Sequence, residues 1–125
     1  MNVLLVEDDP GVARLFTTIL ERSGYKVTAV TTAEDALAAL QGALFHCLVV
    51  DLILPRAEGT TFYDELAHAF PEMAARVLFV TGWGNDPKSR ALLAHTGRPV
   101  LAKPVEATDL LAAVKEIANL SPGPL

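Results

Sequence analysis

Carboxylate, hydroxyl and ammonium side chains follow four separate strand-length apolar runs of this chain. Glu7 and Asp8 follow the run at residues 2–6, and Asp51 ends the run at 47–51. Thr81 ends the run at 77–81, and Lys103 follows the run at 99–102. A carboxylate held beside cationic groups can attack a phosphoryl group, because the cations neutralise charge on the phosphoryl oxygens. A hydroxyl such as Thr81 can donate to one of those oxygens. If the fold brings these residues together, they fit phosphoryl transfer to a carboxylate, with Asp51 as the candidate nucleophile.

The acidic residues also predict a bound cation. Carboxylates from Glu7, Asp8 and Asp51 would carry a charge of about −3, and crowding like charges raises carboxylate pKa values unless cations offset them. The three histidines are scattered without ligand spacing, so the ligands are oxygens and favour a hard ion. Mg²⁺ fits best, with Mn²⁺ as the alternative, because it uses one or two protein carboxylates together with phosphate oxygens. With Lys103 and one Mg²⁺ the formal charge returns to about zero.

The elements that must position these residues are predicted to form an α/β fold. Strand-length apolar runs alternate five times with segments of helical periodicity, which is typical of a parallel sheet covered by helices on both faces. Ligands bind beyond the carboxyl ends of the strands in such sheets, and the polar residues named above fall there. The predicted strands are Asn2 to Val6, Lys26 to Val30, Cys47 to Asp51, Val77 to Thr81 and Pro99 to Ala102.

Helical periodicity predicts about five helices, each with an apolar face toward the sheet. The first begins at Pro10, beside the helix-favouring charge of Asp9, and is closed by Gly24. The second begins at Thr32, with Asp35 in a capping-box position, and ends at Gly42. The predicted apolar face of the first helix comprises Val12, Leu15, Phe16, Ile19 and Leu20, and that of the second comprises Ala33, Ala36, Leu37 and Leu40.

The remaining helices are less uniform. The third stops before Pro71, since the residue before a proline disfavours the helical conformation. The segment from Asp86 to His95 is predicted to be a short or mobile helix, because it contains Pro87 and only a short apolar core. The third helix carries Phe62, Leu66, Ala69 and Phe70 on one side, and the last carries Leu110, Ala113, Val114 and Ile117.

Composition and charge narrow the class of protein. A chain of 125 residues with 51% hydrophobic and 20% charged residues is typical of one globular domain, predicted to span residues 1–120 with a tail or the start of a linker at 121–125. The net charge of −5 argues against direct binding to nucleic acid or to an anionic membrane. We find neither a signal peptide nor a membrane span, and expect a cytoplasmic protein in which the single Cys47 is a buried hydrophobe.

Four strings of residues resemble the response regulator receiver domains of two-component signalling. They are Val6-Glu7-Asp8-Asp9-Pro10, Asp51-Leu52-Ile53-Leu54-Pro55-Arg56-Ala57-Glu58-Gly59, Val80-Thr81-Gly82 and Lys103-Pro104. The resemblance covers essentially the whole chain. It implies a flavodoxin-like, doubly wound five-stranded parallel sheet in the strand order 2-1-3-4-5, and a cis peptide bond between Lys103 and Pro104.

The same resemblance implies a role for each residue of the motifs. Asp51 corresponds to the phosphoacceptor, Thr81 to the switch hydroxyl and Lys103 to the phosphate-pairing lysine. The metal ligands would be Glu7, Asp8, Asp51 and the backbone carbonyl of Ile53. The implied partner is a sensor histidine kinase or a histidine phosphotransfer domain, and a homodimer is a further possibility. Such a domain is a signalling element that assists its own phosphorylation and dephosphorylation, rather than an enzyme acting on other substrates.

One position departs from the family pattern and leaves a second functional class open. Response regulators usually carry Tyr or Phe three residues before the lysine, where this chain has Val100. Valine has one stiff side-chain torsion and no ring to swing, so the usual relay from Thr81 to the last strand is not available. The alternative is an interaction module with a receiver fold that signals without phosphorylation. A phosphatase with an aspartyl nucleophile is disfavoured, because Ile53 stands where that chemistry usually needs a second Asp.

Overall fold

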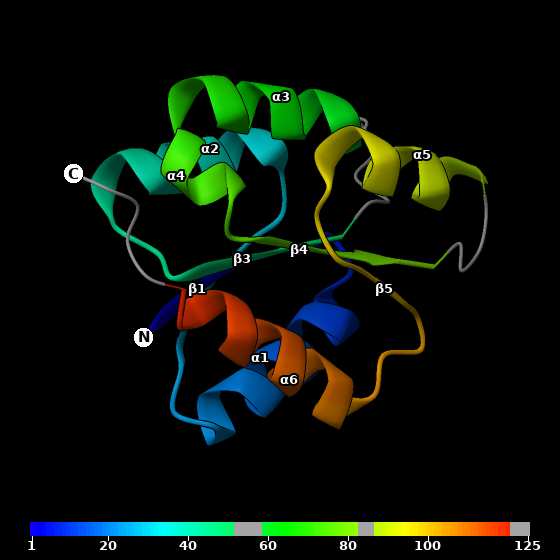
Figure 1. Ribbon diagram of the computed structural model, residues 1–125. Helices are drawn as coiled ribbons and strands as arrows, with labels where there is room; N and C mark the ends of the chain where they lie inside the picture. Colours follow the sequence, from blue (N-terminus) through cyan, green and yellow to red (C-terminus); the bar gives the residue numbers. More distant parts are fainter. Residues whose placement is uncertain (52–58, 83–86, 121–125) are drawn as a thin grey trace.

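Five parallel strands form a single sheet at the centre of the molecule (Figure 1). The computed structural model describes residues 1–51, 59–82 and 87–120. The strand order is β2-β1-β3-β4-β5, so the predicted doubly wound α/β fold and its strand order are confirmed. The strands are β1 (Asn2–Val6), β2 (Lys26–Val30), β3 (Cys47–Asp51), β4 (Val77–Thr81) and β5 (Val100–Ala102).

The last strand begins one residue later than predicted. Pro99 lies just before β5 and still accepts a hydrogen bond from the Phe79 N–H through its carbonyl, at 3.0 Å. Proline has no N–H to donate, so it can take part in a ladder only at a strand's margin. β5 is therefore the three-residue strand Val100–Ala102.

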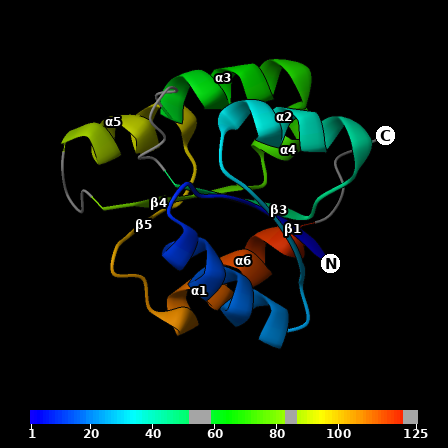
Figure 2. The same cartoon turned by 180° about the vertical axis from the view of Figure 1, so that it is seen from behind.

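Helices cover both faces of the sheet (Figures 1 and 2). Successive strand side chains point to opposite faces, so Val3 and Leu5 enter one apolar cluster while Leu4 and Val6 enter the other. Strands β1, β3 and β4 are covered on both sides, which explains their unbroken apolar sequences. One face carries α1 (Pro10–Arg22) and α6 (Ala107–Ala118), and the other carries α2 (Ala33–Gly42), α3 (Gly59–Ala69), α4 (Pro71–Ala74) and α5 (Pro87–Thr96).

The described parts of the chain contain six helices, one more than predicted. The predicted stop of α3 before Pro71 is confirmed, but Pro71 then opens the short helix α4. Proline is favourable in the first turn of a helix, where its missing N–H would have no intrahelical partner. The predicted helix near Asp86 to His95 is α5, which has ten residues and begins at Pro87. None of these helices is long and apolar enough to cross a membrane, within the residues that the structure describes.

Two predicted inward-facing residues are exposed instead. Leu15 on α1 is 55% exposed, whereas Phe16 and Leu20 of the same helix are buried. Leu15 is turned by about 100° from Phe16 around the helix axis, which places it outside the stripe that contacts the sheet. Ala69 is also exposed, because it is the last residue of α3, where the chain turns toward α4.

The predicted helix ends are formed by the expected residues. The Asp9 side chain accepts hydrogen bonds from the N–H groups of Gly11 (2.8 Å) and Val12 (3.2 Å) at the start of α1. Gly24 has a φ of 94° just after α1, in the left-handed region that glycine adopts without strain. The Thr32 hydroxyl accepts from the Asp35 N–H at 3.0 Å. The predicted cis peptide bond between Lys103 and Pro104 is present.

Arg76 joins the C-terminal end of α6 to the amino edge of the sheet. Its guanidinium donates to the carbonyls of His46 (3.2 Å), Ile117 (3.2 Å) and Leu120 (2.9 Å). Ile117 lies in the last turn of α6 and Leu120 lies just beyond it, where the negative end of the helix dipole favours a cation. The end of α6 is thereby fixed beside the start of β3.

Candidate functional site

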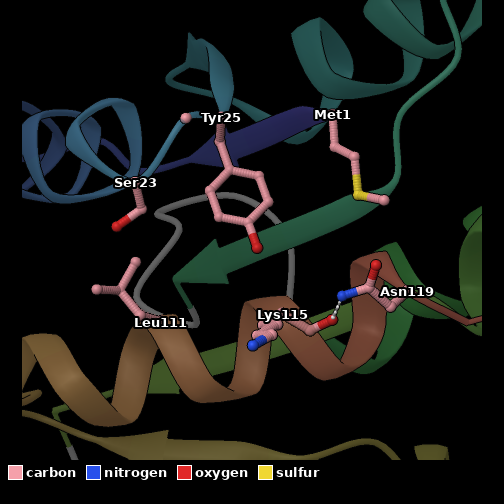
Figure 3. A pocket seen from close by; sticks show the side chains of 7 residues that line it. Met1, Ser23, Tyr25, Leu111, Lys115 and Asn119 are labelled. Atoms are coloured by element: carbon pink, nitrogen blue, oxygen red, sulfur yellow. Dashed lines mark hydrogen bonds between the residues drawn. The ribbon is translucent and has the colours of Figure 1, made fainter.

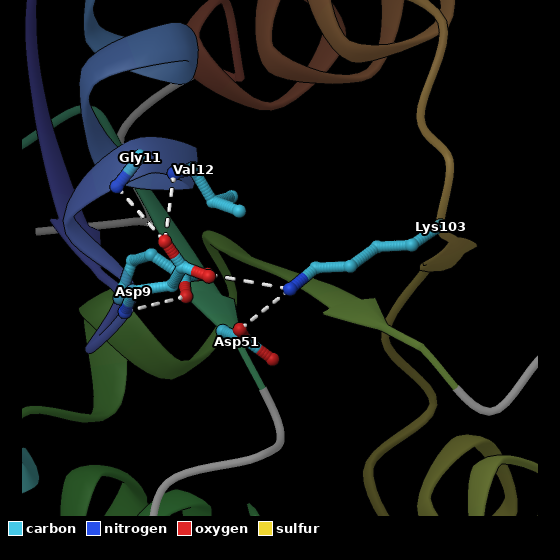
Figure 4. Close-up of polar contacts among 6 residues, drawn as sticks. Asp9, Gly11, Val12, Asp51 and Lys103 are labelled. Atoms are coloured by element: carbon cyan, nitrogen blue, oxygen red, sulfur yellow. Dashed lines mark hydrogen bonds and ion pairs between the residues drawn. The ribbon is translucent and has the colours of Figure 1, made fainter.

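The carboxyl edge of the sheet brings the predicted chemical residues together. Glu7 directly follows β1, Asp51 ends β3, Thr81 ends β4 and Lys103 follows β5. The strands β1, β3, β4 and β5 are consecutive neighbours and run parallel, so their carboxyl ends meet along one edge. Figure 4 shows Lys103 reaching from the segment after β5 toward Asp51.

Lys103 bridges the two buried carboxyl groups of the site. Its Nζ lies 2.7 Å from Asp51 Oδ2 and 3.6 Å from Glu7 Oε2. Both Glu7 and Asp51 are only 2% exposed. Burial lowers the pKa of Lys103, but the hydrogen bond and negative charge of Asp51, together with Glu7, outweigh burial and raise that pKa above its ordinary value. Lys103 is therefore a permanent cation of this site at physiological pH.

Glu7 is held in place by backbone groups. Its N–H donates to the Val30 carbonyl at 3.0 Å, and its Oε1 accepts from the Asp9 N–H at 3.1 Å. Burial, and then the Asp51 carboxyl beside it, raise the pKa of Glu7 to about 8, although the Asp9 N–H and Lys103 act in the opposite direction. Glu7 is therefore mostly protonated at neutral pH.

The site fits a hard divalent cation. One carboxylate oxygen from each of Glu7, Asp8 and Asp51 lies within 4.8 Å of the others. Glu7 Oε2 is buried and accepts no hydrogen bond from the residues that the structure describes. A buried oxygen without a donor is costly unless a cation or proton satisfies it. An oxygen-only donor set with one such oxygen matches the ligands that Mg²⁺ prefers.

The structure brings most of the predicted site residues to one edge of the sheet. Glu7, Asp8, Asp51 and Lys103 lie together, and Thr81 is buried at the end of β4, the strand next to Asp51. The Ile53 carbonyl, predicted as a metal ligand, lies outside the described residues.

Sequence reasoning missed the contribution of the Asp9 backbone. The sequence indicated Asp9 only as a charge at the start of α1, but the Asp9 N–H also donates a hydrogen bond to Glu7 Oε1. The signal was its position two residues after Glu7, at a helix N-terminus whose turn directs N–H groups back toward the preceding residues.

The histidines lie away from the site. The Nδ1 of His46 accepts a hydrogen bond from the Asn2 N–H at 3.0 Å, at the amino edge of the sheet. The Nε2 of His95 lies 2.7 Å from Asp64 Oδ1, joining α5 to α3. Neither contact includes a residue of the acidic cluster.

Val100 is packed into the core beside two aromatic rings. It pairs in register with Phe79 of β4 and belongs, half-buried, to the cluster that also contains Tyr63 of α3. The Tyr63 and Phe79 rings are tilted against each other with centroids 6.3 Å apart. Val100, the position that departs from the family pattern, thus packs against this apolar cluster.

Comparisons of sequence and structure relate this chain to receiver domains. A family model described as response regulator receiver domain matches residues 3–115. The response regulator receiver protein CpdR of Brucella abortus is 27% identical over 93% of this chain and 95% of its own length. The sensor kinase CckA of Brucella abortus is 31% identical over 93% of this chain, which spans only 12% of the kinase. A CheY-like receiver domain protein from Methanospirillum hungatei JF-1 superposes with a TM-score of 0.83 at 29% identity, over 94% of this chain and 93% of its own.

Proposed function

The chain belongs to the response regulator receiver domain family, and from that membership we propose that it accepts a phosphoryl group on Asp51 and signals by a change of conformation. The observation that supports this proposal most strongly is the contact of 2.7 Å between Lys103 Nζ and Asp51 Oδ2, within a cluster of three carboxylates. A buried carboxylate beside a fixed ammonium group is arranged for nucleophilic attack on a phosphoryl group.

In the proposed reaction an Asp51 carboxylate oxygen attacks the phosphorus of a phosphohistidine. The new P–O bond forms as the P–N bond breaks, and the electron pair of the broken bond returns to the imidazole of the donor. Lys103 neutralises charge on the phosphoryl oxygens, because its ammonium already lies beside Asp51. Thr81 donates its hydroxyl to a phosphoryl oxygen, which draws the end of β4 toward Asp51 and begins the conformational change.

Glu7, Asp8 and Asp51, with the backbone carbonyl of Ile53, are the residues that we propose to hold Mg²⁺, or Mn²⁺ in its place. When bound, the ion would supply positive charge that neutralises the phosphoryl oxygens. Glu7 and Asp8 contribute carboxylate oxygens from the turn after β1, and the Asp9 N–H keeps Glu7 oriented. In this proposal Lys103 and the ion neutralise the charge of the phosphoryl group, and the Asp9 N–H orients the Glu7 carboxylate.

The phosphoryl donor that we propose is a sensor histidine kinase or a histidine phosphotransfer domain. The similarity to a segment of the sensor kinase CckA supports a donor of this type. We place the receiver domain in residues 1–120, in the cytoplasm, with 121–125 as a tail or linker that lies outside the described residues. The domain would signal without enzymatic action on other molecules and without direct contact with nucleic acid, and a homodimer would be compatible with this role.

A second candidate function follows from Val100. Because this residue is half-buried against the apolar core and has no ring to reorient, the second candidate is an interaction module that acts without phosphorylation. The two functions differ in whether Asp51 reacts, so the same experiment separates them.

Incubation with Mg²⁺ and acetyl phosphate is expected to add the mass of one phosphoryl group to the intact protein. Asp51→Asn should abolish the addition, because an amide is not nucleophilic enough to attack phosphorus. Asp109→Asn is the matched control, since Asp109 is an exposed acid at the same edge of the sheet, in the first turn of α6. If wild type gains no mass, the interaction module is favoured, and if Asp51→Asn gains as much as wild type, the acceptor is a different residue.

Mg²⁺ affinity is expected to rise with pH because of Glu7. The pKa of Glu7 is raised to about 8, so the ion must displace a proton at lower pH. We expect the affinity to increase at least about tenfold from roughly pH 6 to pH 8 and then to level off. Calorimetric titration in buffers of different ionisation enthalpy measures the affinity and the protons released together. A Mg²⁺ affinity that does not change with pH, or a pH dependence that persists in Glu7→Gln, would contradict the role of Glu7 as the titrating ligand.

A further inference from the structure

A pocket lies at the opposite end of the molecule from the acidic cluster. It has a volume of about 410 Å³ and lies between the end of α1, the start of β2 and α6 (Figure 3). We call it the α1–α6 pocket. Its lining includes the apolar side chains of Met1, Tyr25 and Leu111 and the polar side chains of Ser23, Lys115 and Asn119. A volume of this size admits one bulky side chain with its neighbours, or a small ligand.

Exposed apolar side chains gather at the same edge of the sheet. Among the described residues five large apolar side chains are exposed, and three of them, Met1, Leu44 and Leu120, lie at the amino edge. Leu44 is 82% exposed, and its carbonyl accepts a hydrogen bond from the Asn2 side chain, next to Met1. The hydrogen bond from Arg76 to the Leu120 carbonyl places Leu120 at the same edge. Exposed apolar groups that cluster beside a pocket are typical of a protein interaction surface.

The charge of the amino edge is opposite to that of the rest of the protein. The chain carries a net charge of −5, yet within the described ranges the amino edge holds more cations than acids. Nearest the pocket are the cations Arg22, Lys26 and Lys115 and the acids Glu21 and Glu116. Farther along the edge, Arg76 and Arg98 donate to backbone carbonyls, and Glu72 lies in α4. A partner surface that complements this edge is therefore acidic.

We propose that the α1–α6 pocket binds an acidic segment of a partner protein. A bulky apolar side chain of the segment enters the pocket against Tyr25 and Leu111, and a neighbouring carboxylate pairs with Lys115. The surface is separate from the acidic cluster at the carboxyl edge, so a phosphoryl donor at Asp51 and this segment can bind at the same time. Binding at the pocket does not require phosphorylation of Asp51.

Selection from a displayed library of random peptides on the immobilised, folded full chain tests the proposal. We expect wild type and Asp51→Asn to enrich peptides with a carboxylate beside a bulky apolar residue. For a synthetic copy of an enriched peptide, Lys115→Glu should weaken binding by about tenfold. A selection repeated on Lys115→Glu should enrich basic peptides instead of acidic ones. Ser23→Trp should block peptide binding, because the larger side chain fills the pocket.

Arg14→Glu is the matched control, because it makes the same change of charge at an exposed position on the first half of α1. Circular dichroism establishes that each variant is folded. The proposal is overturned if no such peptides are enriched, or if Arg14→Glu and Lys115→Glu weaken binding equally. Lys115-dependent binding to phosphatidylglycerol vesicles without peptide enrichment would assign the edge to an anionic membrane and would also overturn it.

Discussion

Lys103→Met is expected to slow phosphoryl transfer to Asp51 by about 100-fold at saturating Mg²⁺. The substitution keeps the aliphatic stem and removes the ammonium that lies 2.7 Å from Asp51 Oδ2 and 3.6 Å from Glu7 Oε2. Without it, the phosphoryl oxygens lose a fixed cation, and two buried carboxyl groups face each other without the lysine. The loss falls on the rate because the cation acts on charge at the reacting group.

The rate is measured by the time course of phosphoryl incorporation from acetyl phosphate, followed by intact mass. Lys26→Met is the matched control, since Lys26 is an exposed lysine at the start of β2, on the far edge of the sheet. We expect the control to react like wild type. A Lys103→Met rate within about threefold of wild type, less than 1 kcal/mol in activation free energy, would show that the ammonium is not part of the mechanism.

Two adjacent acids are expected to give opposite results when each is replaced by alanine. Asp8 is exposed and contributes an oxygen to the acidic cluster, so Asp8→Ala should lower Mg²⁺ affinity at least about tenfold with little change in stability. Asp9 caps α1 through the N–H groups of Gly11 and Val12, so Asp9→Ala should lower the free energy of unfolding by about 1 kcal/mol. The Asp9 N–H that holds Glu7 remains in alanine, so Mg²⁺ affinity should persist.

Mg²⁺ titration calorimetry and urea unfolding measure the two quantities on the same pair of proteins. Each variant serves as the control for the other, because both remove one carboxylate from the same turn. Equal losses of Mg²⁺ affinity in both variants would mean that the general negative charge of the turn, rather than Asp8 as a ligand, attracts the ion.

The sheet and the acidic cluster could be predicted because both follow from local pattern. Strands buried on both faces, such as β3 and β4, are unbroken apolar runs, and the polar residue that ends each run marks the carboxyl edge. The positions of Asp51 and Thr81 then follow from the parallel arrangement alone. The order of the strands came from the family resemblance, since periodicity does not determine which strands are neighbours.

The incorrect predictions concern how far an apolar face extends around and along a helix. Leu15 has the same residue type as Leu20, but its position around the helix axis lies outside the stripe that contacts the sheet, so Leu15 is exposed and Leu20 is buried. The start of α4 at Pro71 was missed because a proline that ends one helix can also open the next. The orientation of Glu7 by the Asp9 N–H depends on the geometry of a turn, which residue types do not specify.

The position of the phosphoryl group on the chain is the most direct test of the proposed function. Borohydride reduction of the acetyl phosphate-treated protein converts an aspartyl phosphate to homoserine, and tandem mass spectrometry of its peptides then locates that residue. We predict homoserine at position 51 in wild type treated with Mg²⁺ and acetyl phosphate, and none when Mg²⁺ is chelated. Homoserine at position 8 or 9 instead, or at no position, would contradict the assignment of Asp51 as the phosphoacceptor.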